Sequence, residues 1–297
     1  MNYVITGSLG NISKPITEKL IKAGHTVTVI TSKETNRGDI EALGAKAAVG
    51  SIEDAAFVSA SFAGADAVYL MIPPNYAVTD WLAYQQQVAD NYVAAIITNG
   101  IKHVVQLSSI GAHLRKGTGP IDGLGYLEEQ LGDLKDCNAK FLRPAYFFYN
   151  LHNMAGMIKG MNIMGSNFGD TEEKLVLVHT DDIADAAFEE LNSLSFTGHT
   201  VRYIASDERH PSEIAAVLSS AVGKPGVPWV TFSDEQNLQG MLGAGLSQPL
   251  AQGYTTMGAS IRNGSIQEDY WKNKPAVLGK IKLEDFARDF AAAYHSN

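Results

Sequence analysis

The sequence predicts an α/β fold: a doubly wound parallel sheet with helices on both faces, followed by a smaller and mostly helical C-terminal part. Short apolar, β-branched runs alternate with stretches of helical spacing through the first half of the chain. Strands that alternate with helices pair in parallel through right-handed crossovers. The 28 glycines fit many tight turns between strands and helices, and the last third has a mostly helical pattern.

The opening residues show this alternation most clearly. An apolar run over 2–6 predicts a strand. Ile12, Ile16 and Leu20 then recur at helical spacing until Gly24, a residue suited to a helix C-cap. The same signals predict five more strands in the first half, at 26–31, 45–49, 67–72, 103–108 and 139–142.

Helical spacing separates most of these strands, and the pattern loosens after about residue 150. Helices are predicted at 54–63, 78–99, 181–191, 211–222, 238–262 and 283–294. Two further strands are predicted at 175–178 and 200–205.

Composition argues against several classes of partner. The formal net charge is −9 and the basic residues form no run, so nucleic acid is not expected as a partner. Cys137 is the single cysteine and cannot form an internal disulfide. No apolar run reaches the roughly 20 residues of a membrane span, and no signal-peptide pattern opens the chain. We expect a cytoplasmic protein that binds no membrane, and no metal site, since paired-Cys and His-Glu-x-x-His spacings are absent.

The turn between the first strand and the first helix predicts a phosphate-binding loop. Gly7 can adopt positive φ, and Gly10 lets a pyrophosphate approach the backbone beside a helix N-terminus. Ser13 stands where a third glycine usually lies, so a purely structural turn is the alternative. The residues expected to contact the cofactor here are Gly7, Ser8, Leu9, Gly10, Asn11 and Ile12. We therefore expect residues 1–150 to form an NAD(P)-binding Rossmann core to which 175–205 return, and residues 151–297 to form a smaller substrate-side subdomain.

The end of the second predicted strand indicates which dinucleotide binds. NAD-selective sites usually carry an acid about 20 residues beyond the glycine turn. Here the strand ends in Thr31, Ser32 and Lys33, with Arg37 shortly after. Hydroxyls and cations suit a 2′-phosphate, so NADP(H) is expected in preference to NAD(H).

Several motifs, taken in order, resemble the NmrA-like branch of the atypical short-chain dehydrogenase/reductase (SDR) superfamily. They are Gly7-Ser8-Leu9-Gly10, Gly50-Ser51-Ile52-Glu53-Asp54, Ala65-Asp66-Ala67-Val68-Tyr69 with Met71-Ile72-Pro73-Pro74, His103 to Ser109, Leu142-Arg143-Pro144-Ala145-Tyr146-Phe147 with Asn150, and Asp181-Asp182-Ile183-Ala184. The resemblance implies a seven-stranded Rossmann core with a small C-terminal subdomain that binds NADP(H) or NAD(H).

The resemblance also implies roles for residues after the later strands. The loop at Met71, Ile72 and Pro73 would run along the cofactor. Ser108, Pro144 and Tyr146 would lie near the nicotinamide. Gly50-Ser51 departs from the family's usual Gly-Asp pair, which puts an adenine contact from that position in doubt.

The acid of a catalytic short-chain reductase is not evident. Such enzymes use a tyrosine as proton donor with a lysine four residues later, but Gln130 stands four residues after Tyr126. A substitute cation four residues before Glu128 is missing too, because Leu124 stands there. The remaining candidate catalytic residues are Ser108, Ser109 and Tyr126. The pattern Tyr270-Trp271-Lys272-Asn273-Lys274 spells the motif outside its structural context and is interpreted as coincidence.

Two functions remain open on these observations. The first is an oxidoreductase that passes hydride from NADPH to a small apolar substrate such as a quinone or other conjugated carbonyl, which needs less help from a protein acid. The second is a non-catalytic regulator that senses NAD(P)(H), which the missing Tyr-Lys pair favours. Met154, Met157, Met161 and Met164 recur at helical intervals and are expected to pack in the core.

Overall fold

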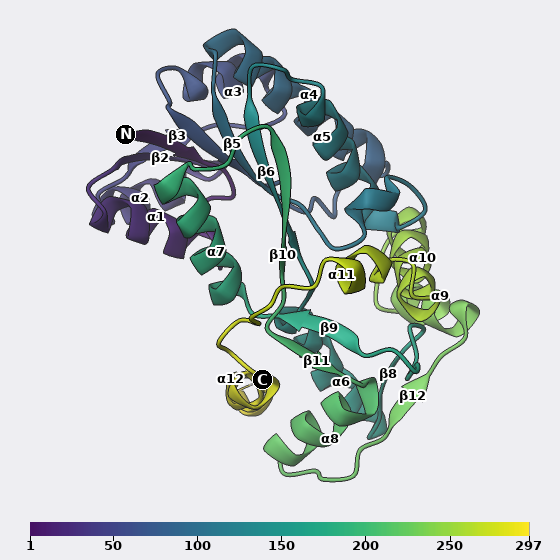
Figure 1. Cartoon of the computed structure of the whole chain (residues 1–297). Coiled ribbons are helices and arrows are strands. Elements are labelled where there is room, and N and C mark those ends of the chain that lie inside the picture. The colour runs from purple at the N-terminus through teal and green to yellow at the C-terminus, as the bar shows by residue number, and fades with distance from the viewer. Residues whose placement is uncertain (297) are drawn as a thin grey trace.

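The computed structural model describes residues 1–296. Its centre is a seven-stranded parallel sheet in the order β10-β6-β5-β4-β1-β2-β3 (Figure 1). The strands span β1 Asn2–Ile5, β2 Thr26–Thr31, β3 Lys46–Val49, β4 Ala67–Leu70, β5 His103–Leu107, β6 Asn138–Pro144 and β10 His199–Ile204. The strand order reverses between β1 and β4, and ligands of open α/β sheets bind at such a point beyond the carboxyl ends of the strands. The predicted doubly wound fold is confirmed.

Helices cover both faces of this sheet (Figure 1). One face packs against α1 Ser13–Lys22, α2 Arg37–Ala42 and α7 Thr180–Ser193, and the other against α3 Ala55–Phe62, α4 Trp81–Asn99 and α5 Asp122–Gly132. The strands alternate accordingly: Ile5 and Tyr69 belong to the first core cluster, whereas Val4 and Val68 belong to the second. Burial on both faces explains why the strands read as continuous apolar runs.

The later part of the chain builds two small sheets beside the large one. Strands β7 Tyr146–Phe147, β9 Leu175–Val178 and β11 Asp207–Arg209 form one sheet, and β8 Met164–Ser166 pairs with β12 Trp229–Thr231 in the other. The chain re-enters the main sheet at β10, which pairs with β6. The accompanying helices are α6 Met154–Met161, α8 Pro211–Ala221, α9 Asp234–Gly243, α10 Gln248–Arg262, α11 Glu268–Lys272 and α12 Leu283–Ser296.

Some local predictions were wrong. The single helix predicted at 238–262 is two helices, α9 and α10, because Gly245 has φ +90° and Pro249 stands in the first turn of α10. The helix predicted at 78–99 begins at Trp81, after Asp80 accepts the amide of Ala83 as an N-cap. Not all four methionines pack in the core, since Met161 is 58% exposed.

The Asp181-Asp182 motif ties the C-terminal segment to the core. The buried carboxylate of Asp182 accepts the hydroxyl of Ser206 at 2.6 Å and the amides of Lys280 and Ile281 at 3.0 and 3.2 Å. These bonds place the segment before α12 against α7. Within residues 1–296, we find no helix that combines the length and the hydropathy needed to cross a membrane.

Candidate active site

The turn between β1 and α1 is shaped for close approach by a ligand. Gly7 has φ +93°, and a Cβ there would lie 2.6 Å from Ser13 Oγ and 2.7 Å from Met71 Cγ. A Cβ on Gly10 would lie 3.2 Å from the carbonyl oxygen of Gly7. Ser13 replaces the third glycine by donating its hydroxyl to Thr6 O at 2.9 Å, so its side chain joins strand to helix. The turn is therefore tight without the usual third glycine.

The amides at the start of α1 are left for a ligand. The N–H groups of Asn11, Ile12 and Ser13 donate no hydrogen bond to any other described residue. No side chain caps the helix, and its first turn holds no acid. Free amides at the positive end of a helix form a binding site for an anion such as a phosphate.

A cavity of about 180 Å³ opens in front of these amides. Its wall includes residues of the turn itself and, from other elements, Tyr69, Met71, Leu107, Phe147, Tyr149 and Thr180. The hydroxyl of Tyr69 is buried without a hydrogen-bond partner among residues 1–296, and burial raises the pKa of this phenol. A glycine cradle, three free amides and an orphaned buried hydroxyl fit the diphosphate of a dinucleotide.

Polar side chains gather at the end of β2. Ser8 Oγ lies 2.9 Å from Thr31 Oγ1, and the amide of Asn36 donates to both oxygens at 2.9 and 3.2 Å. Ser32 and Lys33 follow and are exposed. Sequence reasoning missed Asn36, because its contact with Ser8 depends on the fold of the short 3₁₀ turn at Glu34–Asn36.

Glu34 was also not among the cofactor-binding residues predicted from the sequence. Its carboxylate accepts Arg37 Nε at 2.5 Å and Nη2 at 3.1 Å, and Glu41 lies 3.8 Å from the same guanidinium. The hydrogen bond from Arg37 lowers the pKa of Glu34. Arg37 is thus an exposed cation that is already paired.

The loop after β4 is held firmly on its inner side. Met71 N donates to Thr6 Oγ1 at 2.7 Å, and Tyr84 donates its hydroxyl to Pro73 O at 3.1 Å. Met71 lines the cavity of the turn, whereas Ile72 packs into the core cluster under α3 and α4. Of the three loop residues predicted to run along the cofactor, Met71 is the one placed in the cavity wall.

Ser108 lies at the end of β5 and is fully engaged. Its hydroxyl donates to Glu128 Oε1 at 2.5 Å, and Arg143 binds the same carboxylate through Nε at 3.0 Å and Nη2 at 2.6 Å. Burial alone would lower the pKa of Arg143, but the hydrogen bonds and charge of Glu128 outweigh it and raise that pKa. Arg143 also donates to Tyr203 and to Asp269. The serine therefore belongs to a buried ion-pair network.

The other two catalytic candidates lie apart from this network. Ser109 donates its hydroxyl to Ile110 O at 2.9 Å. Tyr126 donates to Asp90 Oδ1 on α4 at 2.9 Å, at an exposed position. The structure does not bring the Tyr126 hydroxyl together with the two serines.

The tyrosine and the lysine of the later Tyr-x-x-x-Lys pattern both bind one carboxylate. Tyr270 and Lys274 bind the two carboxylate oxygens of Glu208, at 2.6 and 2.7 Å.

An aromatic group follows the ends of β4 and β6. Tyr146 comes two residues after Pro144 and packs edge-on against Phe168 with ring centroids 5.8 Å apart. Burial first, and then the neighbouring Tyr76 and Tyr146, raise the pKa of Tyr254 on α10. Phe147, which follows Tyr146 in the chain, and Met71, from the same loop as Tyr76, line the cavity of the turn. Burial raises the pKa of Tyr146 to about 12.

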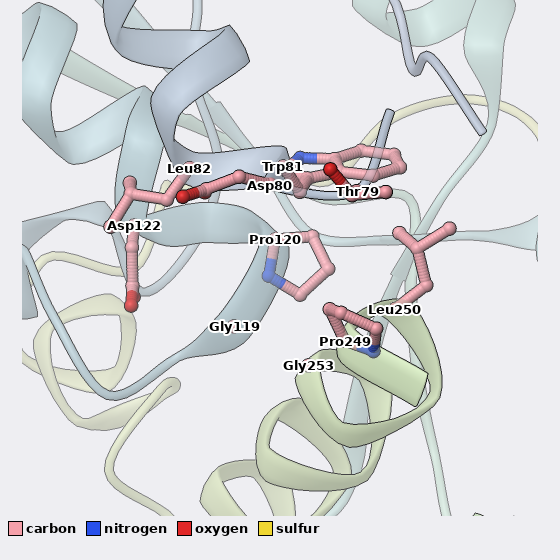
Figure 2. A pocket seen from close by; sticks show the side chains of 10 residues that line it. All are labelled: Thr79, Asp80, Trp81, Leu82, Gly119, Pro120, Asp122, Pro249, Leu250 and Gly253. Atoms are coloured by element: carbon pink, nitrogen blue, oxygen red, sulfur yellow. The ribbon is translucent and has the colours of Figure 1, made fainter. Parts of the chain in front are cut away.

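A second cavity of about 400 Å³ lies between α4 and α10 (Figure 2). Trp81 and Leu82 of α4 face Pro249 and Leu250 of α10 across it, with Pro120 between them. Tyr76 packs edge-on against Trp81 at 5.7 Å, and Gly253, next to Tyr254, also lines the cavity. The contact between Tyr76 and Trp81 thus joins the loop after β4 to the wall of the second cavity.

Residues 7–143 match a family model described as NAD(P)H-binding. The NAD(P)H azoreductase of Xenophilus azovorans is 25% identical over 295 residues, which is 98% of each chain. The NADPH-dependent quinone oxidoreductase QOR2 of Escherichia coli, solved with NADPH, superposes with a TM-score of 0.82 at 19% identity over 97% of this chain and 99% of that one. The Citrobacter sp. triphenylmethane reductase complexed with NADP(H) gives a TM-score of 0.76 at 19% identity, over 97% and 99%.

The matched residues contain the glycine turn, the end of β2 and the buried network around Ser108, so the family match and the geometry concern the same part of the molecule. The solved structures share the fold of this protein along nearly the whole chain. The NAD(P)-binding Rossmann fold expected from the motifs is confirmed: residues 7–143 match an NAD(P)H-binding family model, and this part of the chain carries the glycine turn.

Proposed function

We propose that the protein is an oxidoreductase that passes hydride from NADPH to a quinone or another small conjugated carbonyl. The observation that carries the proposal is the second cavity, in which Trp81 and Leu82 of α4 face Pro249 and Leu250 of α10. The ring of Tyr76 packs edge-on against Trp81 at 5.7 Å and adds an aromatic surface beside it. A planar conjugated acceptor packs well on aromatic and apolar walls of this kind. Quinone and azo reductases among the similar proteins support the same substrate class.

The chain's own residues have separable tasks in this proposal. The amides of Asn11, Ile12 and Ser13 bind the diphosphate, and Met71 in the cavity wall borders the nicotinamide. Tyr146, which the resemblance places beside the nicotinamide, is next to Phe147 of the same wall. The reduced nicotinamide, when bound, supplies the hydride. The apolar second cavity holds the acceptor and excludes water from it. Ser108, which donates to Glu128, is a positioning residue.

We further propose NADP(H) as the preferred cofactor. Thr31, Ser8 and Asn36 offer hydroxyl and amide groups where the adenosine ribose lies in Rossmann folds, and Lys33 is exposed beside them. Arg37 supplies a second cation when a 2′-phosphate takes the place of Glu34. The solved relatives that hold NADPH or NADP(H) support this preference.

We also propose that the two parts of the chain have different roles. Residues 1–150, with 175–205, form the cofactor core, and residues 151–297 form the substrate side. The support is that α10 supplies Pro249, Leu250 and Gly253 to the second cavity, opposite α4.

Cofactor oxidation with a panel of quinones tests the proposed activity. The wild type should oxidise NADPH in the presence of a quinone, and Gly10→Asp should abolish this because its carboxylate repels the diphosphate and its Cβ crowds Gly7. Gly160→Asp is the matched control, since a Cβ at Gly160 meets nothing within 4 Å. An absence of turnover across the panel by the wild type would overturn the proposal.

A non-catalytic NAD(P)(H) sensor is the second candidate function. It is favoured by the engaged hydroxyl of Ser108 and by Gln130 in place of the lysine of the Tyr-Lys pair. Calorimetry with the four forms NAD⁺, NADH, NADP⁺ and NADPH separates the two candidates. A sensor requires affinities that differ between the reduced and oxidised forms together with no quinone turnover.

A further inference from the structure

Tyr69 lies deep in the main sheet, yet it forms part of the wall of the cofactor cavity. It belongs to β4, which pairs with β1 on one side and with β5 on the other. Its ring packs in the core cluster that the sheet shares with α1 and α7, and the whole residue is 0% exposed. The glycine turn and the start of α1 line the same cavity. The ring therefore reaches the ligand site from the protein core.

The hydroxyl of Tyr69 differs from those of the other tyrosines that are buried to the same degree. Three other tyrosines are less than 2% exposed, and each donates its hydroxyl to an acceptor of the protein: Tyr3 to Leu191 O at 2.8 Å, Tyr92 to Met71 O at 3.0 Å and Tyr270 to Glu208 Oε1 at 2.6 Å. The hydroxyl of Tyr69 has no partner among residues 1–296. Buried hydroxyls are nearly always hydrogen-bonded, because an unpaired one has lost its bonds to water without replacement. An orphaned hydroxyl beside a cavity therefore points to an acceptor that arrives with a ligand.

The other groups of the cavity wall indicate which acceptor this is. None of the residues that line the cavity is charged, so a bound diphosphate would meet neither a carboxylate that repels it nor a cation that neutralises it. Its oxygens have to be satisfied by neutral donors. The free amides of Asn11, Ile12 and Ser13 supply such donors from α1. The hydroxyl of Ser13 is already engaged with Thr6 O, whereas that of Tyr69 is free to donate.

We propose that the Tyr69 hydroxyl donates a hydrogen bond to the diphosphate of the bound dinucleotide, so that the sheet as well as α1 holds this group. The inference rests on the dinucleotide-binding part of the proposed function and does not depend on the hydride acceptor. It assigns to β4 a binding role that the sequence did not predict, because Tyr69 was not among the residues expected to contact the cofactor.

The protonation state of Tyr69 suits this role. Burial raises the pKa of the phenol, so the group is protonated at neutral pH. It can therefore donate, and it carries no negative charge that would repel the phosphates. Hydrogen bonds to an ionised acceptor are roughly twice as strong as those between neutral groups. A single buried hydroxyl can thus contribute measurably to cofactor affinity.

Removal of the hydroxyl alone tests the proposal. Tyr69→Phe keeps the buried ring and removes the donor. It should weaken the binding of NADPH and of NADH by about tenfold each, because the diphosphate is common to both cofactors and a hydrogen bond to a charged group is lost. Calorimetric titration measures both affinities without turnover. Equal losses for the two cofactors also distinguish Tyr69 from Arg37, whose removal should affect NADPH alone.

Fragments of the cofactor locate the contact. ADP-ribose keeps the diphosphate but lacks the nicotinamide, and adenosine 2′-phosphate lacks both. Tyr69→Phe should weaken ADP-ribose by the same factor as NADH and change the affinity for adenosine 2′-phosphate less than about twofold. A loss that is confined to NADPH and NADH would place the hydroxyl at the nicotinamide half and overturn the assignment to the diphosphate.

Tyr3→Phe is the matched control. Tyr3 is 1% exposed, lies on the neighbouring strand β1 and packs in the same core cluster. Its removal leaves Leu191 O without a donor, so Tyr3→Phe should lower the Tm of the ligand-free protein by about 2–4 °C and leave cofactor affinity unchanged. Tyr69→Phe removes no hydrogen bond of the protein, so its ligand-free Tm should not fall. The rise in Tm on addition of NADPH should be smaller in Tyr69→Phe than in wild type.

The outcomes separate the role of Tyr69 from the function of the protein. If the wild type binds neither NADPH nor NADH, dinucleotide binding is wrong and the role of Tyr69 falls with it. If Tyr69→Phe binds both cofactors as tightly as the wild type does, Tyr69 is not a donor to the cofactor although cofactor binding stands. A ligand-free Tm that falls as far as in Tyr3→Phe would show that the hydroxyl has a structural partner, and this too would overturn the proposal. A protein that binds the cofactor but reduces no quinone would remove the proposed oxidoreductase and leave the role of Tyr69 to be decided by the affinities.

Discussion

Ser108 donates its hydroxyl to Glu128 across 2.5 Å, and this hydrogen bond joins the end of β5 to the middle of α5. A serine at a strand end beside a cofactor cavity suggests chemistry by its position alone. Its actual partner is a carboxylate that is held by Arg143 and almost completely buried. The bond therefore serves the integrity of the site.

The hydrogen-bond network around Glu128 predicts that its members contribute unequally to the free energy of unfolding. Ser108→Ala removes one hydrogen bond and should lower the free energy of unfolding by about 1 kcal/mol, with kcat for a quinone changed less than about threefold. Glu128→Ala leaves Arg143 buried without its partner and should cost about 3–5 kcal/mol. Urea denaturation measures both. Glu268→Ala, in the exposed pair with Lys272, is the control and should change the free energy of unfolding far less than Glu128→Ala does. Equal losses for Glu128→Ala and Glu268→Ala would contradict the network's importance.

Cofactor selectivity should depend on the exchange of Arg37 between Glu34 and the 2′-phosphate. Arg37→Ala removes a charge-assisted contact with the 2′-phosphate and should weaken NADPH binding by roughly tenfold or more, with NADH binding unchanged. Glu34→Gln frees the guanidinium and removes a repulsive charge, so NADPH binding should tighten. Fluorescence titrations with both cofactors measure this. NADPH affinity that is the same in all three proteins would place the phosphate elsewhere.

Tyr126 was a catalytic candidate on the sequence, and the structure gives its hydroxyl a partner on α4. Its hydroxyl is directed to Asp90 at an exposed position, so Tyr126→Phe should change quinone turnover less than about twofold and stability by about 0.5 kcal/mol. Steady-state kinetics with a quinone measure the turnover, and urea denaturation measures the stability. A large loss of turnover in Tyr126→Phe would show that this phenol takes part in the chemistry.

The contact between α9 and α10 should make the free energy of unfolding depend on pH in the acid range. The hydrogen bond from Arg262, and then that from Asn167, lower the pKa of Asp234 to about 2. Because this folded pKa lies below the unfolded value of about 3.9, the stability that Asp234 adds is complete above pH 4 and is lost as pH falls towards 2. Asp234→Asn should be less stable than wild type at pH 6, and the difference should shrink between pH 4 and pH 2. A difference that stays constant over that range would show that the ion pair contributes no pH-dependent stability.

Much of the sheet could be predicted because its signals are local. Apolar β-branched runs mark the strands, and glycine and proline mark their ends, as at Gly7 and Gly24. Helix α5 carries Gly123 and Gly125 in its first turn, which weaken a helical pattern; both are accommodated because other chain segments pack closely there, with Gln85 against Gly123 and Ala112 against Gly125. The break between α9 and α10 was not predicted, because helical spacing continues on both sides of it.

By itself, the sequence determined the α/β class, the glycine turn and the kind of ligand that the turn binds, because a strand, a tight turn and a free helix N-terminus are made by residues that are neighbours in the chain. The tertiary structure alone decided that Ser108 is bound by Glu128, that Arg143 holds the same carboxylate, and that Asp182 binds the segment before α12. These partners lie 15 to 99 residues apart, so they are set by how helices pack on a twisted sheet, and no short-range spacing records that packing.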